Sequence, residues 1–70
     1  MNRILELSAV MFKEYPDCVN IKQLQDMLGI KRTKTYELLK NGEIKAKKIG
    51  KDYKIPKYNV LAYLFNEEQL

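Results

Sequence analysis

Four side chains between residues 32 and 37 carry the hydrogen-bonding groups needed to read DNA base edges. They are Arg32, Thr33, Lys34 and Glu37, and helical spacing predicts that they point outward from one short helix. An arginine can bond guanine, and a carboxylate can accept a hydrogen bond from the amino group of cytosine. We therefore predict that these side chains contact bases, although a merely solvated helix face is an equally good interpretation for any one of them.

Lysines concentrated in the second half of the chain add phosphate-binding chemistry. Residues 31–57 carry ten basic and three acidic side chains, a formal charge of +7, whereas residues 1–30 carry −1 and residues 58–70 carry −2. This asymmetry indicates a surface that binds a polyanion. Solubility explains a single lysine more simply, but it explains the cluster less well. The predicted phosphate contacts lie in a hairpin and beside the base-reading helix: Lys48, Lys51, Lys54, Lys31 and Lys40.

No catalytic constellation is recognisable in the sequence. The chain has no histidine, the commonest general base and metal ligand, and no paired-cysteine spacing or glycine-rich phosphate loop. We therefore predict that the protein is not an enzyme and that it takes no cofactor, metal or small-molecule ligand. No apolar run is long enough to cross a membrane. The single cysteine, Cys18, fits a reducing cytoplasm.

A helix, a tight turn and a second helix, together residues 20–41, are predicted to position the base-reading side chains. Asn20 is a good N-cap for a helix over 21–28, because Gln23 follows three residues later as in a capping box. Gly29 then permits a sharp exit with positive φ. This pattern predicts the first half of a helix-turn-helix motif.

The second helix is predicted over residues 32–41, with Tyr36 and Leu39 buried. Its start is unusual because Lys31 stands where a Ser or Thr cap is expected. Either Thr33 caps this helix, or its first N–H groups stay open to solvent or to a phosphate.

A lysine-rich hairpin, residues 44–55, is predicted to follow this helix. Its strands cover 45–49 and 53–55, and its anchored face is formed by Ile49, Tyr53 and Ile55. Tyr36 and Tyr53 can each stack on a base or contact a phosphate, but packing in the core or the hairpin is the favoured interpretation for both.

Two flanking helices complete one predicted domain over residues 1–70. A helix over 3–14 serves packing or dimerisation, and a last helix over 56–66 begins at Pro56. In the last helix we expect Val60, Tyr63 and Leu64 to point inward. Leu61 and Phe65 then meet either the first helix or a partner chain.

A spaced set of residues runs through helix, turn, helix, hairpin and helix: Leu28-Gly29-Ile30, Tyr36, Leu39, Gly42-Glu43-Ile44, Ala46, Ile49-Gly50, Tyr53, Lys54-Ile55-Pro56, Val60 and Tyr63-Leu64. Through these residues the segment 20–64 resembles the excisionase family of small winged helix-turn-helix proteins, related in fold to the DNA-binding domain of MerR-type regulators. Three positions depart from the family pattern: Lys31 for a Ser or Thr cap, Lys47 for an apolar residue, and Asp52 for a basic residue, which lowers the charge of the wing.

The resemblance implies a mainly α winged helix-turn-helix fold with a small β-hairpin, here with an extra N-terminal helix. It implies double-stranded DNA as the partner, with the second helix in the major groove and the wing on the adjacent backbone or minor groove. Excisionases bend attachment-site DNA and direct an integrase or recombinase toward excision in phages and mobile elements, and some repress transcription. Both roles stay open for this chain, as does self-association on DNA, and the expected location is the nucleoid in the cytoplasm.

The alternative prediction is a protein-interaction module that has the winged-helix shape. It would bind a partner through the N-terminal helix together with Leu61 and Phe65. The charge of residues 31–57 would then be incidental, and neutralising Lys48, Lys51 and Lys54 would change function little.

Overall fold

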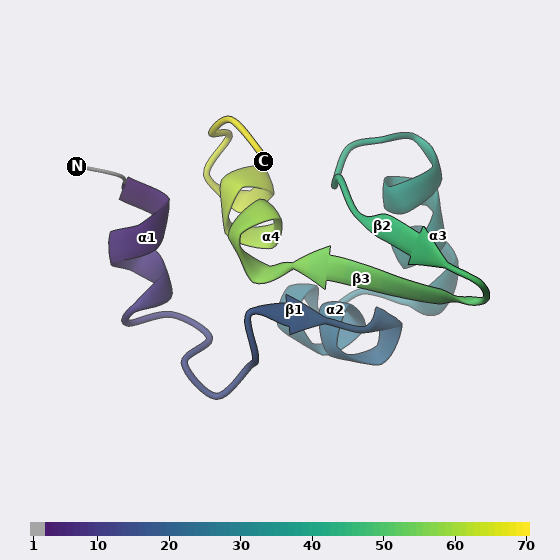
Figure 1. Cartoon of the computed structure of the whole chain (residues 1–70), viewed down its shortest axis with the longest axis horizontal. Coiled ribbons are helices and arrows are strands. Elements are labelled where there is room, and N and C mark those ends of the chain that lie inside the picture. The colour runs from purple at the N-terminus through teal and green to yellow at the C-terminus, as the bar shows by residue number, and fades with distance from the viewer. Residues whose placement is uncertain (1–2) are drawn as a thin grey trace.

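A three-stranded antiparallel sheet lies at the centre of the computed structural model, which describes residues 3–70 (Figure 1). The strand order is β1-β3-β2: β3 (Asp52–Pro56) pairs with β1 (Cys18–Val19) on one side and with β2 (Lys47–Ile49) on the other. Strand β1 was not predicted, because two residues are too few to show a strand period. Its Val19 is paired with Ile55 and is buried, so it extends the hairpin into the core.

The helix-turn-helix is built from α2 (Ile21–Leu28) and α3 (Arg32–Lys40). The predicted capping box at the start of α2 is confirmed: the Gln23 backbone N–H donates to Asn20 Oδ1 at 2.8 Å, and the Asn20 N–H donates to Gln23 Oε1 at 3.0 Å. Gly29 adopts a φ of 64°, as its predicted role at the helix exit requires. These local signals fix where α2 begins and where the chain turns toward α3.

Helix α3 is rotated relative to the prediction, which placed Tyr36 and Leu39 in the core. Thr35 and Leu38 are its buried residues, whereas Tyr36 and Leu39 are only partly covered. Burial of a threonine is tolerated here because its hydroxyl donates to the Lys31 carbonyl at 3.0 Å. No side chain caps the helix, so Thr33 does not take that role and the first N–H groups of α3 stay open.

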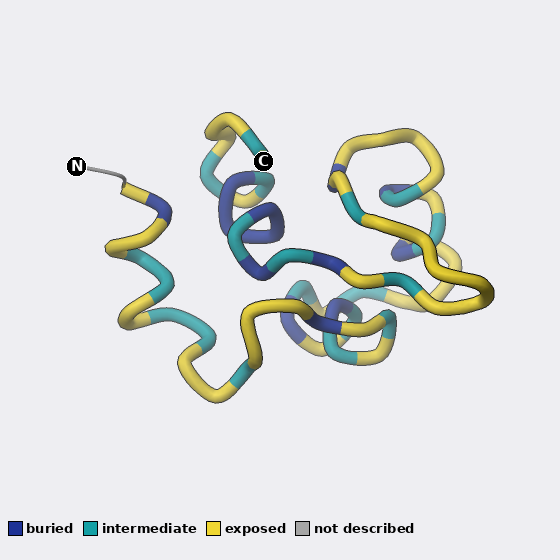
Figure 2. The backbone as a smooth tube through the Cα atoms, viewed as in Figure 1, coloured by how far each residue is buried: buried dark blue, intermediate teal, exposed yellow. Residues whose placement is uncertain are grey.

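The main core joins both helices of the motif to the sheet and to α4 (Lys57–Leu64). Figure 2 marks the buried residues of the described chain in dark blue along the backbone. Its buried members are apolar and come from every element except α1 and β2: Val19, Leu24, Met27, Leu38, Ile44, Ile55 and Val60. Since α2, α3 and the hairpin share this core, the lysine-bearing strands are held at a fixed position beside α3.

The hairpin differs from the prediction on one strand. Ile49 was expected on the anchored face, but it is 53% exposed. It stands directly opposite Asp52, and cross-strand partners share a face of the sheet, so Ile49 lies on the face opposite to Tyr53. Tyr53 is partly buried and Ile55 is buried, as expected.

The N-terminal helix is shorter than predicted. Helix α1 spans Arg3–Ser8, and the rest of the predicted 3–14 segment consists of turns. The Ser8 hydroxyl donates to the Leu5 carbonyl at 2.8 Å, and Phe12 adopts a φ of 57°, which a continuing right-handed helix cannot include. The hydrophobic spacing was therefore correct for packing but misleading about length.

Helices α1 and α4 pack against each other in a second, smaller core of Ile4, Leu61 and Ala62. Leu61 is fully buried there, and Phe65 is partly buried, with the Arg3 guanidinium 5.5 Å from its ring centroid. The surface assigned to a partner protein by the alternative prediction is therefore largely used within the chain. Leu64, expected to point inward, is 44% exposed.

A buried lysine fixes the irregular segment that links α1 to β1. Lys57 is only 8% exposed, and its ammonium donates to the carbonyls of Phe12 and Tyr15 at 3.4 and 3.3 Å. Its backbone N–H also donates to the Asp17 carbonyl at 2.7 Å. Lys57 is thus a structural residue, so one positive charge of the 31–57 segment does not face a ligand.

The last residues of the chain are tied to the loop that enters β2. The buried Asn59 amide donates to the Lys45 carbonyl at 2.8 Å and accepts from the Leu70 N–H at 2.8 Å. Beside it, Gln69 accepts from the Lys45 N–H at 2.7 Å and donates to the Glu43 carbonyl at 2.6 Å. These four bonds hold the base of the hairpin against α4.

Candidate nucleic-acid interface

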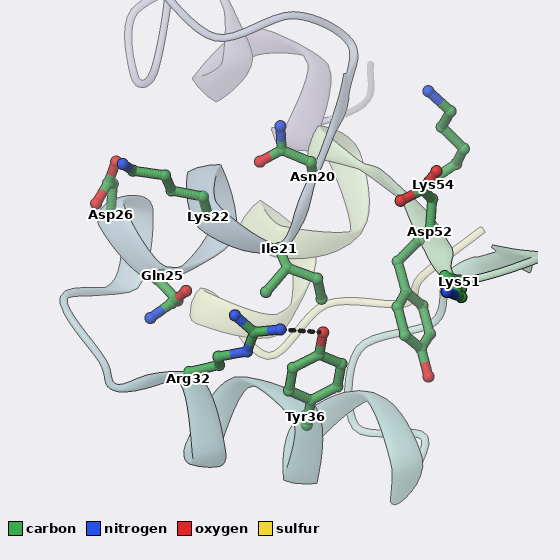
Figure 3. Close-up of a pocket in the computed structure, with 11 residues that line it drawn as sticks. Asn20, Ile21, Lys22, Gln25, Asp26, Arg32, Tyr36, Lys51, Asp52 and Lys54 are labelled. Atoms are coloured by element: carbon green, nitrogen blue, oxygen red, sulfur yellow. Dashed lines mark hydrogen bonds between the residues drawn. The ribbon is translucent and has the colours of Figure 1, made fainter.

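An open groove forms where the start of α2, one flank of α3 and the β2–β3 turn meet (Figure 3). Its volume is about 920 Å³. The residues that line it are polar or aromatic except for one isoleucine: Asn20, Ile21, Lys22, Gln25, Asp26, Arg32, Tyr36, Lys51, Asp52, Tyr53 and Lys54. The shared core beneath these three elements is what brings their side chains to one face.

Arg32 lies inside this groove, held against Tyr36. These residues are four positions apart on α3, a spacing that puts them on the same side of a helix. The guanidinium carbon is 5.5 Å from the Tyr36 ring centroid, and Nη2 donates to the tyrosine hydroxyl at 3.4 Å. Figure 3 shows both side chains directed toward the groove, with Ile21 of α2 across from them. The arginine head is therefore positioned before any ligand arrives.

Tyr36 and Tyr53 connect α3 to the hairpin. Their rings meet edge to face, with centroids 6.1 Å apart and an interplanar angle of 66°. Lys48, the cross-strand partner of Tyr53, places its ammonium 5.8 Å from the Tyr53 centroid. These side chains therefore form a continuous row of cation–aromatic and aromatic contacts, in the order Arg32, Tyr36, Tyr53 and Lys48. The sequence favoured a packing role for both tyrosines, and their ring contacts agree with it. Both side chains also line the groove.

Positive charges exceed negative charges around the groove. Lys22, Arg32, Lys51 and Lys54 line it against Asp26 and Asp52. In Figure 3, Lys22 and Asp26 lie together at one rim, and Lys54 extends away from Arg32 at the other. Arg32 is the cation nearest the middle of the groove in this view.

The structure brings together only part of the predicted set. Arg32, Lys51 and Lys54 share the groove, and Lys48 joins through Tyr53. Helical geometry places the exposed Thr33, Glu37 and Lys40 along the outer face of α3. The exposed Lys34 follows Arg32 by two residues, so the two side chains are about 200° apart around the helix axis. Lys31 is exposed at the N-cap of α3.

Sequence reasoning missed the contribution of α2. Asn20, Lys22 and Gln25 line the groove, although only Asn20 was noted, and then as a cap. For Lys22 and Gln25 the signal was available, because the helical period that buries Leu24 leaves these two positions on another side of α2.

Lys47 lies directly opposite Lys54 across the two strands, so two lysine side chains share one face of the hairpin. Like charges at such positions repel unless an anion lies near them.

Within residues 3–70, no cluster of three or more His, Cys, Asp or Glu side chains is arranged to hold a metal ion. Over the same described range, no helix combines the length and apolar character that crossing a bilayer requires.

Comparison with protein families agrees with this geometry. Residues 18–66 match the family model of a helix-turn-helix domain. The chain belongs to this helix-turn-helix family. The matched segment begins at β1 and includes α2, α3, the hairpin and α4, so the N-terminal helix α1 lies outside it. No curated protein and no solved structure gives a significant match to the chain.

Membership of a helix-turn-helix family supports DNA binding as the general function, and domains of this family are typically not enzymes. The predicted fold class is confirmed at this level: helices dominate, and the small antiparallel sheet is compatible with the wing of a winged helix-turn-helix.

Proposed function

We propose that this helix-turn-helix domain binds double-stranded DNA by inserting α3 into the major groove and placing the β2–β3 turn on the adjacent backbone or minor groove. The observation that carries the proposal is the convergence of cationic side chains from α2, α3 and the hairpin on one face. A DNA backbone meets several elements of a bound protein at once. Its phosphates therefore require cations from separate elements that lie on one face of the protein.

Base reading is assigned to the outer face of α3. Thr33 and Glu37 point away from the core and are exposed, with Lys31, Lys34 and Lys40 beside them. Major-groove readout requires donors and acceptors that extend from a helix without being engaged elsewhere. Within the described residues, neither Thr33 nor Glu37 is engaged in a side-chain hydrogen bond or ion pair. Lys48, Lys51 and Lys54 are assigned to phosphates.

Duplex binding measured against salt concentration tests the proposal. If about six phosphates are contacted, affinity falls on the order of a thousandfold between low and physiological salt. The triple variant Lys48→Gln, Lys51→Gln, Lys54→Gln should lose most of this affinity and about half of the salt slope while keeping its thermal unfolding midpoint. Lys13→Gln, an exposed lysine before β1, is the control that should bind as the parent does. Salt-insensitive binding by the parent protein contradicts the proposal.

The finer role is proposed from the resemblance of residues 20–64 to excisionases. The domain would act as an architectural factor that guides an integrase or recombinase, or as a small transcription regulator, in a phage or mobile element. A short single-domain footprint favours paired or cooperative binding on DNA. A gel assay with the bound site at varied positions along a fragment separates the roles, since an architectural factor changes mobility by bending DNA and a simple blocking repressor does not.

A further inference from the structure

We propose that the groove between α3 and the hairpin holds the phosphate backbone of one DNA strand, with Arg32 as a phosphate clamp rather than a base reader and Tyr36 as its positioning residue. This inference rests on the proposed duplex binding and specifies which part of the surface meets which part of the DNA.

The proposed docking, with the β2–β3 turn in the neighbouring minor groove, places a DNA strand at this site. When a recognition helix occupies the major groove and a hairpin turn reaches the neighbouring minor groove, the backbone between those two DNA grooves passes between the helix and the turn. In this protein the space between α3 and the turn is the groove lined by Arg32, Tyr36 and Lys51. On the α2 side it is bordered by Asn20 and Gln25, whose amides are suitable donors to phosphate oxygens.

The conformation of Arg32 also favours phosphate over a base edge. Its guanidinium lies over the Tyr36 ring and donates to the tyrosine hydroxyl, which keeps it on the flank of α3. Thr33, on the outer face, is about 100° away around the helix axis. To reach a base in front of α3, Arg32 would have to give up both contacts with Tyr36. Tyr36 uses one of the five N–H donors of the guanidinium, which leaves the others for phosphate oxygens.

Tyr36 is itself held in place from the hairpin side. Its ring packs against Tyr53 at a centroid distance of 6.1 Å, so the position of the arginine is linked to the strand that carries the wing. The clamp therefore includes a cation on α3, a ring that supports it and a second ring on β3. Arginine suits this arrangement better than lysine, because a planar guanidinium can stack and donate at the same time.

The first experiment measures affinity for two short duplexes, one selected from a random library by the parent protein and one of unrelated sequence, at several salt concentrations. Arg32→Ala should weaken binding to both duplexes by the same factor, about tenfold, and lower the magnitude of the salt slope by about one. Arg32→Lys should recover only part of the affinity, since the charge remains but the stacked fork does not. Tyr36→Phe, which removes only the hydroxyl, should cause a smaller loss in the same direction. The control is Lys13→Ala, which removes one exposed charge from the segment before β1, outside the proposed interface.

A second experiment identifies the phosphate. Single phosphates of the selected duplex are replaced by uncharged methylphosphonates, and each is tested with the parent protein and with Arg32→Ala. One or two positions between the base contacts and the wing contacts should weaken the parent several-fold and leave the variant unchanged, which is the signature of a direct pairwise interaction. Arg32→Ala that merely disturbs the fold would lose affinity without this selective insensitivity.

The outcomes separate this inference from the proposal beneath it. If the parent protein binds no duplex in a salt-dependent manner, both fail. If the parent binds but Arg32→Ala relaxes the preference at one base pair, Arg32 reads a base and the clamp is refuted. Equal losses from Arg32→Ala and Lys13→Ala, or no loss from Arg32→Ala, also refute the clamp while leaving DNA binding in place.

Discussion

The ring of Tyr36 on α3 meets the ring of Tyr53 on β3 edge to face, with centroids 6.1 Å apart. This contact joins two parts of the proposed DNA-binding surface that lie apart in the sequence, helix α3 and the hairpin. A two-stranded hairpin has little stability of its own, so its orientation depends on such contacts. The pair therefore couples the position of the wing lysines to that of Arg32.

Replacing Tyr53 tests this coupling. Tyr53→Ala removes a partly buried ring that contacts both Tyr36 and Lys48, and we expect the free energy of unfolding to fall by about 2 kcal/mol. DNA affinity should fall as well, because the hairpin loses its support beside α3. Chemical denaturation and duplex titration measure the two effects. Tyr53→Phe keeps the ring and should resemble the parent in both; a large loss from this variant would assign the role to the hydroxyl instead.

Lys57 provides a prediction about stability alone. Lys57→Met keeps an unbranched apolar stem but removes the ammonium that donates to the Phe12 and Tyr15 carbonyls, so the free energy of unfolding should fall by about 1–2 kcal/mol. DNA affinity should stay within a factor of about two, because a buried lysine contacts no phosphate. Thermal unfolding and duplex binding, compared with the exposed Lys13→Met, provide the check. A tenfold loss of DNA affinity in a folded Lys57→Met would place this residue in the interface.

The sequence predicted those features that depend on local signals. The capping box at Asn20 and Gln23 and the positive φ of Gly29 are determined by near neighbours, and both are present. The helix-turn-helix and the hairpin were predicted from such local signals. The concentration of positive charge in residues 31–57 was counted directly from the sequence.

Features determined by tertiary packing were harder to predict. Ile4 and Phe12 follow a helical spacing, but the chain leaves the helix at Ser8 because the 9–17 segment is held by Lys57, far away in sequence. Likewise, the four-residue spacing places Arg32 beside Tyr36, but it does not indicate that this side of α3 faces the hairpin. Helical period alone could not distinguish the groove flank of α3 from its outer face, because that distinction depends on where the wing packs.

Asn59 joins α4 to the loop before β2, and its two bonds can be separated. Asn59→Asp keeps the acceptor for the Leu70 N–H but loses the donor to the Lys45 carbonyl, whereas Asn59→Ala loses both. We expect Asn59→Ala to cost about 1–3 kcal/mol, because a carbonyl and an N–H group lose their partner at a buried site. Hydrogen exchange at the Leu70 amide should accelerate in Asn59→Ala more than in Asn59→Asp. Equal exchange in the parent and Asn59→Ala would show that this bond is not maintained in solution.

Leu61 and Leu64 discriminate between internal packing and a partner surface on α4. Leu61 is fully buried against α1, so Leu61→Ala should lower the free energy of unfolding by about 2–4 kcal/mol. Leu64 is 44% exposed, so Leu64→Ala should change it by less than about 1 kcal/mol. Urea denaturation compares the two variants. Near-parent stability of Leu61→Ala would mean that α1 does not pack on α4, which would make the face available to another chain.

Glu37 tests the assignment of base reading to the outer face of α3. An unpaired carboxylate beside DNA phosphates weakens nonspecific binding, but it can select a base by accepting a hydrogen bond from a cytosine amino group. Glu37→Gln removes the charge at almost constant shape, so affinity for an unrelated duplex should rise a few-fold. The preference at one C·G pair of the selected site should fall by about tenfold. Titrating the selected duplex and its single-pair variants measures both effects. The comparison variant is Lys40→Gln, on the same face of α3 but predicted to contact phosphate, and it should lower the affinity for all duplexes by the same factor. Glu37→Gln removes a negative charge and Lys40→Gln removes a positive charge, so their effects on nonspecific affinity should have opposite signs. If Glu37→Gln raises the affinity for every duplex equally and leaves the base preference unchanged, the carboxylate only opposes binding. Thr33 would then be the reader on this face.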